Sequence, residues 1–144
     1  MLQLQTTTFF YVDDDSDDRS FFQEAADELG ENVSIFELGD EMMQILKNPP
    51  PKPSVVFIDL NMPIKNGFEL LQEIRSSSGF NSIPIVVYST SNSIDTISKC
   101  MELGASLFIT KAISLSSLIK AIEHVMGIDW ENFKPNLQTF VYKS

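Results

Sequence analysis

The sequence predicts an α/β fold built on a five-stranded parallel doubly wound sheet with helices on both faces. Two observations lead to this prediction. Short apolar runs, rich in β-branched and aromatic residues, alternate with stretches of helical periodicity along the 144 residues. Each apolar run also ends at a polar residue. Alternation of this kind is typical of a parallel sheet that is covered by its connecting helices.

A strand and a long amphipathic helix come first. Phe9–Val12 is a compact apolar run that stops at Asp13. Ser16 is the expected N-cap of the next helix, and Asp17 and Asp18 fall in its first turn, where the helix dipole favours negative charge. The apolar face of this helix, and the glycine that ends it, are Phe21, Phe22, Ala25, Leu29 and Gly30.

Two further pairs of a strand and a helix follow. Val33–Phe36 is the next predicted strand, with a short helix over Asp40–Lys47. A proline-rich connector then leads to Val55–Ile58, which is apolar throughout, as expected of a strand buried on both faces. Asn66-Gly67 is a turn signal. It precedes a helix marked by Phe68, Leu71 and Ile74.

The last two pairs complete the sheet. Ile85–Tyr88 and Leu107–Thr110 are the remaining predicted strands. Between them lies a helix marked by Ile94, Ile97 and Met101 and ended by Gly104, and Ser114 caps a final helix bearing Leu115, Leu118, Ile122 and Val125. Because parallel crossovers are right-handed, few topologies remain, and we predict the flavodoxin-like strand order 2-1-3-4-5.

Composition narrows the classes of function. The net charge of −10 disfavours binding to nucleic acid or to anionic lipid. One cysteine cannot form an internal disulfide, and one histidine makes a zinc site of the usual type improbable. No apolar run approaches the ~20 residues that cross a membrane, and no basic segment precedes the first one. We therefore expect a cytoplasmic protein without a membrane contact.

Polar residues gather where the strands end. Asp13 and Asp14 follow the first strand, Asp59 the third, Ser89 the fourth and Lys111 the fifth. The predicted topology brings all five to one sheet edge near its switch point, where ligands bind. Three carboxylates at close range repel one another, so a cation must neutralise them, and oxygen ligands suit Mg²⁺. With the lysine and the hydroxyl, such a site would receive a phosphoryl group.

These motifs resemble a known family, the response-regulator receiver domains (CheY-like) of two-component phosphorelay signalling. The resemblance extends from about Phe9 to Met126. The motifs that carry it are Val12-Asp13-Asp14, Asp59-Leu60-Asn61-Met62-Pro63 with Asn66-Gly67, Tyr88-Ser89-Thr90, and Gly104-Ala105 with Lys111. It implies a signalling phosphoacceptor that catalyses only its own phosphorylation and dephosphorylation, and not an enzyme acting on other substrates.

The resemblance also implies the metal ligands. Asp14 and Asp59 would bind Mg²⁺ directly, together with the backbone carbonyl of Asn61, and Asp13 would act mainly through a metal-bound water. Asp59 would be the phosphoacceptor, receiving its phosphoryl group from a sensor histidine kinase or a histidine phosphotransfer protein. The phosphorylated form would then change how a downstream protein target is bound.

Ser89 and Lys111 would each contact a phosphoryl oxygen, and the Asn61 side chain and Thr90 would tune the lifetime of the phosphoryl group. Two positions depart from the family pattern. Ala112 stands where a proline, often with a cis bond, usually follows the lysine, so we expect a trans bond with a re-aimed loop or a strained peptide. The switch aromatic, often tyrosine, is Phe108, which could still change rotamer with Ser89.

The resemblance divides the chain into a receiver domain over residues 1–126 and a C-terminal tail over residues 127–144. No output domain fits in so short a tail, so a single-domain response regulator is expected, as a monomer or a weak homodimer. The tail carries Trp130, Phe133, Leu137, Phe140, Val141 and Tyr142. Because it is too apolar for a solvated tail, we expect it to pack on its own domain.

Three alternative functions compete with this interpretation. A phosphatase of the haloacid-dehalogenase class would need a general acid two residues after Asp59, but Asn61 cannot donate a proton to a leaving group. A flavin or nucleotide site would need a glycine-rich phosphate loop, and the sequence contains none. A receiver-like protein-interaction module that is not controlled by phosphorylation remains open, and only Phe108 and Ala112 favour it.

Overall fold

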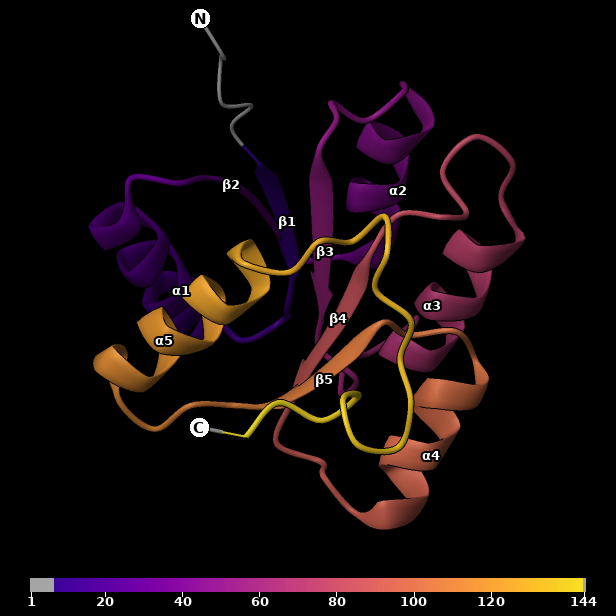
Figure 1. The fold of residues 1–144 in the computed structure, drawn as a ribbon. Coiled ribbons are helices and arrows are strands. Elements are labelled where there is room, and N and C mark those ends of the chain that lie inside the picture. The colour runs from indigo at the N-terminus through magenta and orange to yellow at the C-terminus, as the bar shows by residue number, and fades with distance from the viewer. Residues whose placement is uncertain (1–6, 144) are drawn as a thin grey trace, which may run out of the picture.

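The computed structural model describes residues 7–143 (Figure 1). Strands and helices alternate from end to end, as predicted. The elements in chain order are β1 (Thr8–Val12), α1 (Ser16–Leu29), β2 (Asn32–Phe36), α2 (Gly39–Lys47), β3 (Ser54–Ile58), α3 (Gly67–Ser76), β4 (Ile85–Ser89), α4 (Ile94–Glu102), β5 (Leu107–Thr110) and α5 (Leu115–Met126). The strand bounds agree with the prediction to within one residue.

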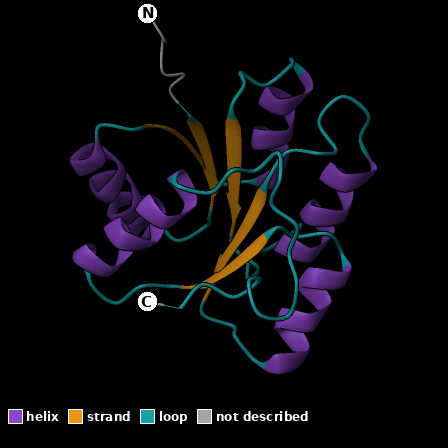
Figure 2. Ribbon diagram, viewed as in Figure 1, coloured by secondary structure: helices purple, strands orange, loops and turns teal. Residues whose placement is uncertain are grey.

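The five strands form one parallel sheet in the order β2-β1-β3-β4-β5, which confirms the predicted topology (Figure 2). The strand order reverses between β1 and β3. In the sheet, Val12 of β1 lies beside Ile58 of β3. The residues that follow these two strands therefore leave the same edge of the sheet side by side.

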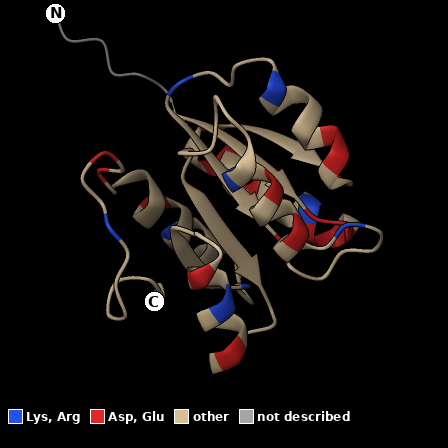
Figure 3. Ribbon diagram, turned by 90° about the vertical axis from the view of Figure 1, so that its right-hand side faces the viewer, with Lys and Arg blue, Asp and Glu red and all other residues tan. Residues whose placement is uncertain are grey.

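Two apolar layers hold the helices against the sheet. Helices α1 and α5 cover one face, and α2, α3 and α4 cover the other (Figure 1). Side chains along each strand point alternately into one layer and the other. For example, Phe10 and Val12 belong to the second layer, and Phe9 and Tyr11 to the first. No strand contains a charged residue, and the charges lie on helices and loops (Figure 3).

Two local predictions were wrong. The N-cap of α1 is Asp15, whose side chain accepts hydrogen bonds from the backbone N–H groups of Asp17 and Asp18, so Ser16 is the first helical residue. Either residue type can cap a helix, and the geometry of the preceding turn decided between them. Ile94 was placed on the apolar face of α4, yet it is 84% exposed because it opens the helix beyond the edge of the core.

The C-terminal tail returns to the sheet, as predicted. It runs alongside the outer edge of β5 (Figure 1), where Val141 forms a parallel bridge with Phe108. Phe140 is only 1% exposed and joins the layer of α2, α3 and α4. Leu137, in contrast, is 90% exposed. Within residues 7–143, no helix is long and apolar enough to cross a membrane.

Candidate functional site

A cleft of about 590 Å³ opens at the carboxyl ends of the strands, where the strand order reverses. Its lining comes from the loops that follow β1, β3, β4 and β5 and from the first turn of α1, so residues far apart in the sequence meet there. The lining residues are Asp13, Asp14, Asp15, Ser16, Asp17, Asp18, Asp59, Asn61, Thr90 and Lys111. The predicted carboxylates and the predicted lysine are thus together, as the topology required.

Asp59 lies at the floor of the cleft. Its side chain is 3% exposed, and its backbone N–H donates to the carbonyl of Val12 at 3.2 Å, which ties the loop to β1. The carboxylate oxygen Oδ1 is buried without a hydrogen-bond partner and lies 3.5 Å from Nζ of Lys111. Burial, and then the charge of Asp13, raise the pKa of Asp59 to about 6, against the opposing charge of Lys111.

Asp13 and Asp14 complete a group of three carboxylates with Asp59. One ligand oxygen from each lies within 4.8 Å of the others. Asp13 is fully buried and accepts hydrogen bonds from the Tyr11 hydroxyl at 2.5 Å and from the backbone N–H of Asp15 at 3.0 Å. Asp14 is more accessible. Three oxygen donors of this kind fit a hard divalent cation such as Mg²⁺.

Lys111 is held by two carboxylates other than Asp59. Its Nζ donates to Asp13 at 2.8 Å and to Asp18 at 2.7 Å. Burial alone lowers the pKa of Lys111, but these two hydrogen bonds outweigh it and the net pKa is raised, so the lysine stays charged. The sequence predicts for Asp18 only a place in the first turn of α1. That assignment was incomplete, because the fold also brings Asp18 to the lysine.

The other predicted residues have less direct positions. Ser89 is fully buried, and its Oγ accepts from the backbone N–H of Ser91 at 3.2 Å. Its neighbour Thr90 lines the cleft. The side-chain amide of Asn61 donates to Oγ of Ser91 at 2.9 Å, which links the loops after β3 and β4. Phe108 is fully buried on β5, beneath the C-terminal tail.

The peptide bond between Lys111 and Ala112 is trans, since the single cis bond between described residues is Lys52–Pro53. The Ala112 N–H, which proline would lack, donates to the Tyr88 hydroxyl at 3.2 Å. Tyr88 is 2% exposed and packs edge-to-face with Tyr11. This contact was not predicted from the sequence. The sequence does show that residue 112, an alanine and not a proline, has a backbone N–H to donate. The spacing of the residues does not indicate which group accepts it.

Gly67 allows the loop that carries Asp59 to pack closely against α3. A Cβ at this position would stand 2.7 Å from Cα of Leu60 and closer still to the carbonyl oxygen of Asp59. Gly67 also donates its N–H to the Leu60 carbonyl at 3.0 Å. Only a residue without a side chain therefore lets α3 begin directly against the loop that carries Asp59.

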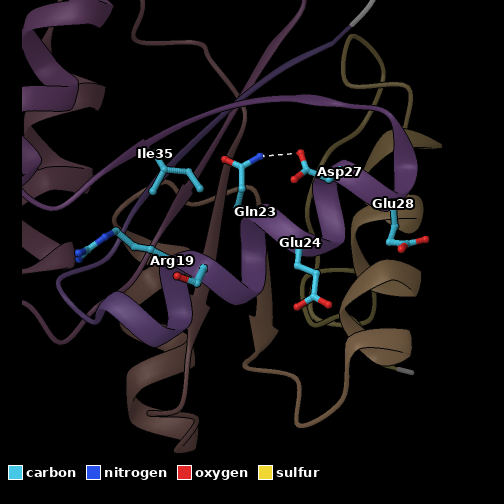
Figure 4. A pocket seen from close by; sticks show the side chains of 7 residues that line it. Arg19, Gln23, Glu24, Asp27, Glu28 and Ile35 are labelled. Carbon is cyan, nitrogen blue, oxygen red and sulfur yellow. Dashed lines mark hydrogen bonds between the residues drawn. The ribbon is translucent and has the colours of Figure 1, made fainter.

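A second hollow, of about 680 Å³, lies along the outer surface of α1 and beside Ile35 of β2 (Figure 4). Three of its polar side chains have hydrogen-bond partners. Gln23 donates to Asp27 at 2.8 Å, and Arg19 donates to the carbonyl of Asp13 at 2.9 Å. Its carboxylates, from Glu24, Asp27 and Glu28, are exposed, and none of its described lining residues carries a buried charge. The cleft at the strand ends therefore remains the candidate site.

Comparisons with known proteins agree with this geometry. The sequence profile of the family described as response regulator receiver domain matches residues 9–123. Two-component response regulator ARR6 of Arabidopsis thaliana is 29% identical over 136 residues, which cover 88% of this chain and 73% of that protein. Response regulator Rcp1 of Synechocystis is 35% identical over 75 residues, covering 52% of this chain and 51% of its own length.

Solved structures give the same result. The phosphorylated cyanobacterial phytochrome response regulator RcpA superposes with a TM-score of 0.75 at 30% identity, covering 91% of this chain and 98% of that one. The Mn²⁺-bound form of Rcp1 superposes with a TM-score of 0.71 at 26% identity, covering 90% and 98%.

Proposed function

Because the chain belongs to the family of response-regulator receiver domains, we propose that it accepts a phosphoryl group on Asp59 from a phosphohistidine of a sensor kinase or phosphotransfer protein. The observation that carries this proposal is the state of the Asp59 carboxylate. Its Oδ1 is buried and has no hydrogen-bond partner, yet it faces a cleft that contains two more carboxylates and a lysine.

In the proposed transfer, an Asp59 carboxylate oxygen forms a bond to phosphorus while the phosphorus–nitrogen bond of the donor histidine breaks. The products are an acyl phosphate on Asp59 and a free imidazole on the donor, which takes up a proton. Lys111 lies near enough to Asp59 to exchange Asp18 for a phosphoryl oxygen. Ser89 would offer its hydroxyl to another oxygen. Positioning and charge neutralisation supply the catalysis.

Asp13, Asp14 and Asp59, with the backbone carbonyl of Asn61, are the groups that would hold Mg²⁺. Their hard oxygen donors match this ion, and the closeness of the three carboxylates requires a positive charge. The bound cation would neutralise charge on the incoming phosphoryl group. That the relative Rcp1 has been solved in a Mn²⁺-bound form supports the binding of a divalent ion.

The test is intact mass after incubation with a small phosphodonor and Mg²⁺. We expect one added phosphoryl group on the wild-type chain and none on Asp59→Asn or without the metal. Asp17→Asn removes an exposed carboxylate from the lining of the same cleft, so this control should still be phosphorylated. An adduct that persists in Asp59→Asn would refute the assignment of the acceptor.

A second candidate function is a protein-interaction module that is not controlled by phosphorylation. It is favoured by the position of Phe108, which the C-terminal tail covers, and by the engagement of Lys111 with Asp13 and Asp18. Failure of the wild-type chain to form any adduct, despite measured binding of Mg²⁺ by calorimetry, would favour this alternative.

A further inference from the structure

The outer edge of β5 is occupied by the chain's own C-terminal segment. The Phe108 N–H donates to the carbonyl of Phe140 at 2.8 Å, and the Tyr142 N–H donates to the carbonyl of Phe108 at 2.9 Å. In a parallel sheet, both backbone groups of one residue point to the same side, so those of Phe108 point away from β4. Without the tail, these two groups would have no partner in the sheet.

Side chains reinforce this docking on both sides of β5. Phe140 is buried in the layer that contains Phe108, and Val141 packs against the same layer. Tyr142 packs against the opposite layer and lies over His124 of α5, with ring centroids 4.8 Å apart. The tail runs along β5, between α4 and α5 (Figure 1).

A turn directs the chain onto this edge. The side chain of Asn136 accepts from the N–H groups of Gln138 and Thr139, at 2.8 and 3.0 Å, and its carbonyl accepts from the N–H of Phe140 at 2.9 Å. Leu137, at the tip of this turn, points into solvent and is 90% exposed. The docked residues are therefore joined to an exposed connector. They could detach from β5 without unfolding the sheet.

Phe108 connects the tail to the cleft. It pairs with Val87 of β4, and alternation along the strand places the side chain of Ser89 on the same face as Val87. The N–H of Lys111 donates to the carbonyl of Ser89 at 3.0 Å. A shift of Ser89 and Lys111 towards a phosphoryl group would therefore change the packing around Phe108, which is in contact with the tail.

We propose that residues 140–142 act as a latch on the outer edge of β5, docked over Phe108 in the unphosphorylated chain and released when Asp59 is phosphorylated. This inference rests on the proposed function. Phe108 and Phe140 belong to the same buried apolar layer, and the N–H of Phe108 donates to the carbonyl of Phe140. We therefore expect a new position of the Phe108 side chain to disturb the docked tail. Any partner that uses the edge of β5 must displace the latch first.

Amide hydrogen exchange in the full chain tests the latch directly. Beryllofluoride with Mg²⁺ serves as the phosphoryl mimic, and ¹⁹F NMR reports its binding. The amides of Phe108 and Tyr142 should exchange faster in the adduct, by about 5-fold or more, a usual size for coupling between sites. The amide of Val56, which donates to Pro84 at 3.0 Å within the sheet, is the internal reference and should not change.

Binding reciprocity supplies a second test. If the adduct releases the tail, weakening the tail must favour the adduct by the same factor. The beryllofluoride concentration at half occupancy should therefore fall by about 5-fold in Phe140→Ala and stay unchanged in Leu137→Ala, its exposed control. Should Phe140→Ala not fold, Tyr142→Ala removes the contact with His124 and takes its place.

The outcomes separate the two proposals. Bound beryllofluoride with unchanged exchange at Phe108 and Tyr142 would overturn the latch and leave the proposed function standing. Absence of any bound beryllofluoride signal would overturn both. Faster exchange at Val56 as well as at the tail amides would indicate loosening of the whole sheet and would also overturn the latch.

Discussion

The cleft and the outer edge of β5 are built in opposite ways. In the cleft, Asp13, Asp59 and Lys111 bring buried charges together, and Asp59 retains an oxygen without a hydrogen bond. At the edge of β5, apolar side chains close the surface, and both backbone groups of Phe108 are paired. Burying the charges of the cleft destabilises the fold but leaves groups there that can react. Burying the apolar side chains at the edge of β5 stabilises the fold, and this edge has no reactive group.

This difference teaches where stability and function reside in the molecule. Buried, incompletely paired charge destabilises a fold, so it persists where it serves chemistry. Burial of aromatic residues stabilises, so the edge can offset part of that cost. We therefore expect loss of the Asp59 carboxylate to weaken phosphorylation without weakening the fold, and loss of apolar side chains at the edge to weaken the fold without weakening phosphorylation.

The largest effect on stability is expected at the edge of β5. Phe140→Ala removes a side chain that is 1% exposed, and should lower the free energy of unfolding by about 3–4 kcal/mol, within the range for Phe→Ala in a core. Urea unfolding measures the change. Leu137→Ala, in the same segment but exposed, should change it by less than about 0.5 kcal/mol. Equal effects would contradict the described docking of the tail.

In the cleft, Asp59→Asn should stabilise the metal-free chain in a pH-dependent way. The pKa of Asp59 is raised from 3.8 to about 6, so the folded state holds this proton more tightly than the unfolded state. Stability from this carboxyl is therefore present below about pH 4 and is lost as pH rises through about 6, by about 3 kcal/mol in total.

The amide side chain of the Asp59→Asn variant has no proton to lose in this range, so the variant should gain stability over wild type between about pH 4 and pH 8. Urea unfolding at both pH values gives the difference. Asp17→Asn, at an exposed position, should show no comparable gain. If Asp59→Asn were less stable than wild type at the higher pH, the carboxylate would be better paired than its burial indicates.

Gly67 packs against the loop that carries Asp59, so a substitution there should affect both stability and phosphorylation. Gly67→Ala would place a Cβ against the backbone of Asp59 and Leu60, costing about 1–3 kcal/mol and displacing Asp59. The phosphorylation rate should fall by about 10-fold or more. Gly127→Ala, whose Cβ would have ordinary contacts at 3.6 Å, is the matched control. A rate unchanged in Gly67→Ala would show that the loop tolerates displacement.

The smallest expected effect concerns the hydrogen bond from Ala112 to Tyr88. Tyr88→Phe keeps the buried ring but removes the acceptor, and should cost about 1 kcal/mol and slow phosphorylation a few-fold, because the loop carrying Lys111 loosens. In an Ala112→Pro background, the donor is already absent, so the same substitution should have no further effect. Additive effects in this double-mutant cycle would show that the two residues do not act together.

The order of strands and the carboxylates of the cleft were predictable because they depend on local patterns. An apolar run ending at Asp13 or Asp59 marks a parallel strand and its functional end, and the topology rules then bring these ends together. The role of Asp18 and the contact between Tyr88 and Ala112 were not predictable. Each depends on the distance between elements that are far apart in the sequence, which no periodicity encodes.

The sequence by itself determined the fold class, the strand order and the residues that meet at the sheet edge, because hydrophobic period and strand ends are local properties of the chain. It also indicated that the tail is too apolar for solvent. Only the tertiary structure decided that Lys111 is shared by Asp13 and Asp18, and that Phe108 is paired with residues 140–142. Contacts of this kind follow from how packed layers place distant side chains, and close packing is a property of the whole molecule.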